Sequence, residues 1–114
     1  MYSSDFVTAL KATGIPVAHF GWEKDRFPSG NYIVYAEDSA SDLEANGLHI
    51  ERATEGFVDL FTRDYSTTQK DLVESVFESR TDIVWHLDTI QFEEETKYAH
   101  YSWMVGQYGK GSTV

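Results

Sequence analysis

The sequence predicts an α+β protein, in which a mainly antiparallel sheet of about four to five strands carries two helices on one face. Two segments repeat apolar residues at spacings of three and four, as amphipathic helices do. Several others are short runs of β-branched and aromatic residues, which favour strands. Most of these strand segments follow one another directly, and consecutive strands favour antiparallel pairing. The expected order is α-β-β-β-α-β-β.

The first helix is expected over residues 3–13, where apolar residues form one stripe. Ser3 or Ser4 can cap its N-terminus, because a serine oxygen accepts a hydrogen bond from the first free backbone N–H groups. Gly14 is suited to the turn that ends the helix. A brief extended segment over residues 15–20 follows.

The middle of the chain predicts two strands separated by an acidic turn. Residues 21–31 mix charged, aromatic, proline and glycine residues and are expected to form a loop. Residues 32–36, YIVYA, form the clearest short strand, and residues 37–47 are acidic and turn-like. A long strand is expected over residues 48–62, with Gly56 marking a bulge or a bend.

The second half of the chain predicts a helix and a closing pair of strands. The helix covers residues 67–80 and has a clear apolar stripe. A strand over residues 83–87 leads through a connection, 88–94, into a long aromatic strand, 95–105. Residues 106–114 contain three glycines and are expected to form a flexible C-terminal tail.

Composition and charge limit the classes of function. The chain has 114 residues, which fits one domain over residues 1–105, and its 41% hydrophobic content makes a packed core feasible. A net charge of −10 disfavours a DNA- or RNA-binding role, because such a surface repels phosphate. The N-terminus does not resemble a signal peptide, and no apolar run is long enough to span a bilayer. We therefore expect a soluble protein without a membrane partner.

Catalytic and metal-binding motifs are weak. The chain contains no cysteine, no GxSxG motif and no glycine-rich phosphate loop. The acidic segment that begins at Asp38 fails the calcium-loop pattern, since Leu43 stands where glycine is needed. Four scattered histidines lack the HExxH spacing, although several could meet in space on strands: His19, His49, His86 and His100. We expect no enzyme activity, no metal and no cofactor.

Aromatic residues are the candidates for contacts with a protein partner. Trp22 and Phe27 lie in the predicted loop, where aromatic side chains either tuck over the edge of the core or anchor an interface. Tyr101 and Trp103 lie in the last predicted strand and either join the core or contact a partner. A base-stacking platform is disfavoured, because such platforms come with a positive groove. The predicted interface residues are Trp22, Phe27, Tyr101 and Trp103.

Two segments carry a resemblance to a known family. LKATGIPVAHFGW, followed after a loop by YIVYAEDSASDLEANG, resembles the small tail terminator, or tail completion, proteins of long-tailed bacteriophages. The order of the remaining predicted elements is similar as well. The sequence departs from the family at the proline that usually precedes the YIVY-like strand, since Pro28 is separated from that strand by three residues. A head-tail stopper or adaptor therefore stays an alternative.

The resemblance implies a structural role in the virion and no cofactor. Proteins of this family form a homo-oligomeric ring, usually a hexamer, that docks on the last ring of the tail tube protein. The ring stops tube polymerisation and presents a surface to a neck or stopper protein. Localisation would be the tail or neck of the virion, after assembly in the host cytoplasm, and DNA would pass through the ring without specific binding.

Within such a ring the acidic residues would acquire a role. Carboxylates that face the channel would repel passing DNA and keep it from adhering. The alternative is that they are ordinary solvated turns. The candidate channel-facing residues are Asp38, Asp42, Glu44, Glu93, Glu94 and Glu95.

Two other classes of function stay open. An acidic domain also suits an inhibitor or nucleic-acid mimic that binds one basic protein, and the stoichiometry of the complex would distinguish it from a ring. An enzyme with a site on its strands is a third class, and a pocket holding at least two of the histidines would favour it.

Overall fold

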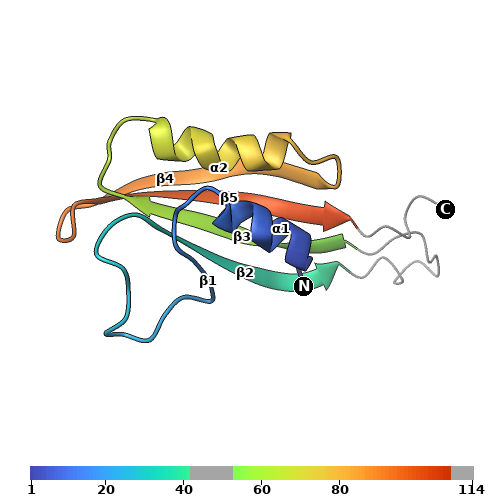
Figure 1. Cartoon of the computed structure of the whole chain (residues 1–114), viewed down its shortest axis with the longest axis horizontal. Helices are drawn as coiled ribbons and strands as arrows, with labels where there is room; N and C mark the ends of the chain where they lie inside the picture. Colours follow the sequence, from blue (N-terminus) through green and yellow to red (C-terminus); the bar gives the residue numbers. More distant parts are fainter. Residues whose placement is uncertain (42–52, 109–114) are drawn as a thin grey trace.

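The computed structural model describes residues 1–41 and 53–108, and it confirms the α+β fold and the predicted order of elements. Its elements are α1 (Ser4–Lys11), β1 (Val17–His19), β2 (Tyr32–Ser41), β3 (Ala53–Thr62), α2 (Thr68–Glu78), β4 (Ile83–Glu93) and β5 (Tyr98–Tyr108). The strands form one five-stranded sheet in the order β1-β2-β3-β5-β4. Both helices lie against the same face of this sheet (Figure 1).

All strand pairs are antiparallel except β1–β2, which is parallel. Residues 20–31 connect β1 to β2, and a connection of this length lets the chain cross back and enter β2 in the same direction as β1. Among the described strands, β4 pairs only with β5 and therefore forms one edge of the sheet. The opposite edge is formed by β1, which covers only the first part of β2.

The predicted start of α1 is confirmed. The Ser3 side chain accepts a hydrogen bond from the Phe6 N–H at 3.2 Å, which satisfies a backbone donor that the helix itself leaves free. Phe6 and Leu10 point into the core and are fully buried. Beyond the helix, Gly14 adopts a φ of 86°, a conformation that glycine reaches without a steric cost.

The core lies between the helices and the sheet. The apolar stripe of α2 contributes Val73 and Phe77 to it, whereas Leu72 of the same predicted stripe is 39% exposed. The sheet contributes the largest buried side chain, Trp103, whose ring meets Phe77 edge-on with centroids 5.6 Å apart. The other members of the core include Ile33, Val58, Leu60, Tyr101 and Val105.

Two strands, β2 and β4, are longer than predicted. β2 continues through Ser41, into the segment that was expected to be an acidic turn. β4 extends to Glu93 instead of ending at residue 87, and a register shift between Leu87 and Thr89 marks a bulge. In each case the pairing partner is a long strand, so its backbone groups can be satisfied well past the apolar run that signals a strand locally.

The predicted C-terminal tail begins too early. Residues 106–108 belong to β5, and Gln107 is 7% exposed instead of lying in a flexible tail. Its amide nitrogen donates to Ser3 Oγ and to Asp82 Oδ2, both at 2.8 Å, and its amide oxygen accepts from the Ser3 N–H at 2.7 Å. Gln107 therefore ties the start of α1 to the segment before β4. The remainder of the predicted tail, residues 109–114, lies outside the described residues.

Candidate interaction surface

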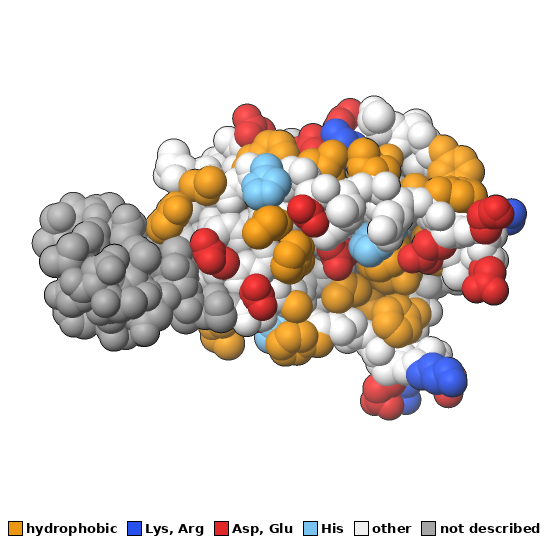
Figure 2. All heavy atoms as spheres, turned by 180° about the vertical axis from the view of Figure 1, so that it is seen from behind, with side chains coloured by type: hydrophobic (Ala, Val, Ile, Leu, Met, Phe, Trp, Pro, Cys, Tyr) orange, Lys and Arg blue, Asp and Glu red, His pale blue; other side chains and the backbone are white. Residues whose placement is uncertain are grey.

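In the described part of the chain no helix covers the sheet face opposite α1 and α2, and this face mixes apolar, acidic and histidine side chains (Figure 2). We call it the open face. Side chains alternate across a strand, so the burial of Trp103 and Val105 against the helices directs Met104 to the open face. Met104 is 41% exposed, and Val84 of β4, which pairs with Gly106 on the same face, is 57% exposed. A surface of this mixed character suits contact with another protein.

An aromatic cluster covers the end of the open face near the β4–β5 hairpin. Tyr32 stacks on Phe61 at a centroid distance of 4.8 Å. Trp22 and Phe27 meet Tyr32 at 5.6 and 5.5 Å, so the loop aromatics pack over the edge of the sheet. Phe27 keeps 44% of its surface exposed. Of the two interpretations of Trp22 and Phe27, the structure shows packing over the core edge, and it leaves part of Phe27 available to a partner.

Polar contacts hold the same loop against the β4–β5 hairpin. The Tyr98 hydroxyl donates to the Gly30 carbonyl at 2.9 Å. The Arg63 guanidinium lies 4.3 Å above the Tyr98 ring and donates to the carbonyls of Ser29 and Thr96 at 2.9 and 3.0 Å. These contacts hold the loop against the hairpin. The exposed part of Phe27 therefore belongs to a loop that is fixed to the sheet.

The prediction that Tyr101 and Trp103 are interface residues is wrong for this monomer. Tyr101 is 8% exposed and Trp103 is fully buried beneath α2. The indole N–H of Trp103 donates to Glu74 Oε2 at 2.9 Å, which satisfies its only polar group. The two rings stack with their centroids 6.0 Å apart, on the sheet face that the helices cover.

The predicted channel-facing acids fall in two places. Asp38 is exposed in the bulge of β2, near the end of the sheet where β5 finishes. Glu94 and Glu95 are exposed in the β4–β5 turn at the opposite end. Glu93 is the last residue of β4, and its carboxylate accepts a hydrogen bond from Thr96 Oγ1 at 3.0 Å. Asp42 and Glu44 lie outside the described residues.

Three of the four histidines lie on different strands, His19 on β1, His86 on β4 and His100 on β5, and His49 lies outside the described residues. His19 Nε2 lies 2.5 Å from Glu37 Oε1 at the β1 edge. Burial acts to raise the pKa of Glu37, but the hydrogen bonds from His19 and the Tyr2 N–H outweigh it and hold that pKa below its usual value. His100 lies on the open face with Nε2 3.7 Å from Asp59 Oδ2. Within residues 1–41 and 53–108 no group of three or more His, Cys, Asp or Glu side chains could hold a metal ion.

An exposed apolar patch on the β4 edge was not predicted from the sequence. Ile90 and Phe92 are 59% and 53% exposed, and Phe92 meets Tyr65 edge-on at 5.6 Å, with Tyr65 itself 58% exposed. We call these three residues the β4 patch. The sequence predicted a connection over residues 88–94, which contains Ile90 and Phe92. Without a predicted strand, alternation could not show which way these side chains point. The signal that could have found them is the apolar residue pair itself within an otherwise polar segment.

No protein-family model matches the chain, and no curated protein matches it either. In the part of the chain that the structure describes, neither helix is long and apolar enough to cross a membrane.

Proposed function

We propose that this protein is a structural component of a phage virion that caps the end of the tail tube, stops its polymerisation and forms part of the head-tail connection. It acts as a homo-oligomeric ring, usually a hexamer, bound to the tube protein on one side and to a neck or stopper protein on the other. The proposal rests on the sequence resemblance to tail terminators, and a stopper or adaptor of the neck is its nearest alternative.

The observation that carries the structural side of this proposal is the β4 patch. Large exposed apolar side chains gather on the edge strand of a chain whose net charge of −10 sets up repulsion between copies. Exposed apolar clusters rimmed by polar residues mark protein–protein contacts. An assembly of acidic copies needs apolar contacts of this kind to outweigh the repulsion between them.

The two edges of the sheet also suit a ring. β4 runs antiparallel to β5 and β5 antiparallel to β3, whereas β2 and β1 run in the same direction as β5. The β4 edge of one copy would therefore meet the β1–β2 edge of the next copy in antiparallel sense. Contacts between two unlike surfaces of identical copies form a ring when the rotation between neighbouring copies closes on itself. The bulge in β4 interrupts the regular row of backbone N–H and C=O groups along this edge. It therefore limits non-specific pairing with strands of other proteins.

Negative-stain microscopy of the protein mixed with purified tail tubes tests the capping function. We expect rings at tube ends and tubes that no longer elongate when tube subunits are added. Sedimentation gives the stoichiometry, which distinguishes a ring from the small complex that an acidic inhibitor or nucleic-acid mimic would form with a single basic protein. Bare tube ends and continued elongation would overturn the proposal.

Replacing Ile90 and Phe92 together by serine is expected to abolish capping. A hot-spot anchor contributes at least about 2 kcal/mol, so loss of one would raise the concentration needed for capping at least about thirtyfold, and loss of both about a thousandfold if their contributions add. Because both side chains are exposed, the free energy of unfolding should change by less than about 1 kcal/mol. The measurement is the concentration of protein that stops tube elongation, together with a thermal melt.

Leu72→Ser is the matched control, since Leu72 is an exposed apolar residue on α2, away from the β4 edge. It should cap like the unaltered protein. Full capping by the Ile90–Phe92 variant would show that the β4 patch is not the contact.

Neutralising the acids that face the channel is expected to slow DNA release from assembled virions while capping persists. Asp38 and the β4–β5 turn lie at opposite ends of the sheet, so two sets are tested separately, as Asp38→Asn with Asp42→Asn and Glu44→Gln, and as Glu94→Gln with Glu95→Gln. Like-charge repulsion keeps DNA from adhering, so only the set that faces the channel should matter. If DNA ejection and tail assembly are unchanged for both sets, the acids are solvated turns.

A further inference from the structure

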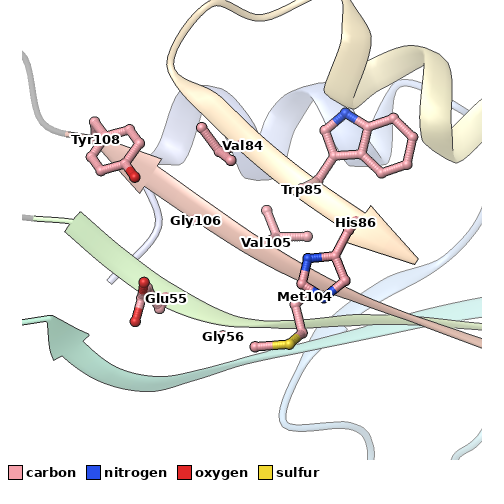
Figure 3. A pocket seen from close by; sticks show the side chains of 9 residues that line it. All are labelled: Glu55, Gly56, Val84, Trp85, His86, Met104, Val105, Gly106 and Tyr108. Carbon is pink, nitrogen blue, oxygen red and sulfur yellow. The ribbon is translucent and has the colours of Figure 1, made fainter. Parts of the chain in front are cut away.

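The open face contains a hollow of about 130 Å³ where β5 passes Gly106 (Figure 3). Gly106 forms its floor, since it presents no side chain between the neighbouring strands. Glu55 of β3 and Tyr108 of β5 stand at one end, and His86 of β4 and Met104 of β5 stand at the other. Val84 completes the wall on the β4 side. A cavity of about 150 Å³ accommodates a benzene ring, so this hollow has room for the end of one long side chain.

The packing of the monomer does not require glycine at position 106. A Cβ placed there would have Val84 O at 3.8 Å and Glu55 Cγ at 3.9 Å as its nearest neighbours, which are ordinary contact distances. Its backbone is not in the left-handed region. Glycine inside a strand costs roughly 0.5–1 kcal/mol relative to alanine, and it often marks a place where a ligand or another backbone approaches closely.

The chemistry of the walls suits a long cationic side chain. Glu55 is exposed and supplies a carboxylate at the rim. Met104 and Val84 supply apolar surface of the kind against which the stem of arginine or lysine packs while its charge stays near water. Tyr108 supplies a ring that attracts a cation placed over its face.

The wider surroundings also favour a cation. Asp38, exposed in the bulge of β2, lies beside the register positions where Glu37 pairs with Gly56 and Ser39 pairs with Glu55. The whole chain carries a net charge of −10, so a basic partner is attracted from a distance.

We propose that the Gly106 hollow binds an arginine side chain presented by a basic partner protein, with Glu55 as its counter-charge. Arginine is favoured over lysine because its planar, weakly hydrated guanidinium stacks on an aromatic ring and pairs with a carboxylate through two donors. This inference goes beyond the capping function, since it names the chemistry by which the open face recognises a partner and requires no ring.

The test is a titration of the full chain with N-acetyl-arginine amide, followed by amide NMR. We expect shifts confined to residues around Gly106, Glu55 and His86, with a dissociation constant of about millimolar, as suits one isolated side chain. N-acetyl-citrulline amide, which has nearly the same shape without the charge, should bind at least about tenfold more weakly. N-acetyl-lysine amide should bind more weakly than the arginine probe.

Two variants tie the shifts to the hollow. Glu55→Gln should weaken the arginine probe by about threefold to tenfold, because it removes the counter-charge. Gly106→Val should abolish binding by filling the floor, and the dispersion of its spectrum shows whether it has folded. Should the valine variant not fold, Gly106→Ala, whose Cβ meets no close contact, takes its place with a partial loss expected.

Unchanged binding by either folded variant, or equal binding of arginine and citrulline, would overturn the proposal. Lys110→Gln provides a further arm, because Lys110 follows β5 closely in the sequence. If this substitution shifts the signals around Gly106 and also strengthens binding of the arginine probe, the occupant is the chain's own tail and the partner proposal is wrong. Capping of tail tubes by Glu55→Gln is measured separately, so loss of arginine binding with intact capping would leave the ring proposal standing.

Discussion

Trp103→Ala is expected to lower the free energy of unfolding by about 3–5 kcal/mol, the usual cost of removing a fully buried tryptophan. Trp103 is 0% exposed and packs between Phe77 of α2 and Tyr101 of its own strand. Its removal leaves a cavity beneath the helix. It also removes the hydrogen bond that the indole N–H donates to Glu74. The total stability of a domain this size is about 5–15 kcal/mol, so the variant should melt far below the unaltered protein. Chemical denaturation measures the change directly.

Met104→Ala is the control for this prediction, because Met104 is the next residue along β5 and faces the other way, with 41% of its surface exposed. Its cost should stay below about 1 kcal/mol. If Trp103→Ala melted like Met104→Ala and instead lost binding to a partner, Trp103 would be an interface residue after all. The pair of variants therefore separates the two roles that the sequence left open.

Gly56→Ala is expected to destabilise the fold by about 3 kcal/mol or more, although it adds only a single methyl group. A Cβ at this position would lie 2.2 Å from the Ala36 carbonyl oxygen, 2.7 Å from Glu37 Cα and 2.9 Å from Tyr2 Oη. Two of these atoms belong to the backbone of β2, so β2 and β3 would have to separate. Overpacking of this kind typically costs 1–3 kcal/mol and occasionally more. The measurement is again the free energy of unfolding.

Tyr2 occupies part of the space that a Cβ at position 56 would need. Its hydroxyl donates to the Val105 carbonyl at 2.8 Å, across the sheet position that Gly56 leaves vacant. Burial raises the pKa of this hydroxyl well above its usual value, with the nearby carboxylates of Glu37 and Glu55 adding to the effect. The N-terminus is thereby hydrogen-bonded to β5. The Tyr2 side chain reaches β5 only because Gly56 has no Cβ in its path.

Gly106→Ala is the matched control for Gly56→Ala. Both glycines lie inside central strands, but a Cβ at Gly106 meets nothing closer than 3.8 Å. Its stability should stay equal or rise by up to about 1 kcal/mol, because alanine loses less chain entropy on folding. A large loss at Gly106 together with no loss at Gly56 would contradict the arrangement of β2, β3 and β5 described above.

Much of the fold could be predicted because its signals are local. The stripe that places Phe6 on a buried face and the serine that caps α1 act within a few residues, so the sequence shows them directly. Strand positions such as Tyr32 also carry their own propensity. Strand ends were less predictable, because β4 and β5 continue wherever a neighbouring strand satisfies their backbone groups.

The candidate interaction surface was predicted only in part. Phe27 is partly exposed as expected, whereas the β4 patch was missed and Trp103 was misplaced. Aromatic content indicates that a strand is important, but it does not say which face of the strand the helices will cover.

The sequence by itself determined the class of fold, the order of its elements and the cap of its first helix. It also determined the net negative charge, which any partner must tolerate or complement. Only the tertiary structure decided that Trp103 faces the helices while Met104 faces out, and that β4 is an exposed edge. It also decided that Gln107 is held between Ser3 and Asp82. The physical reason is range: propensity and periodicity act between near neighbours, whereas burial depends on which distant segments pair.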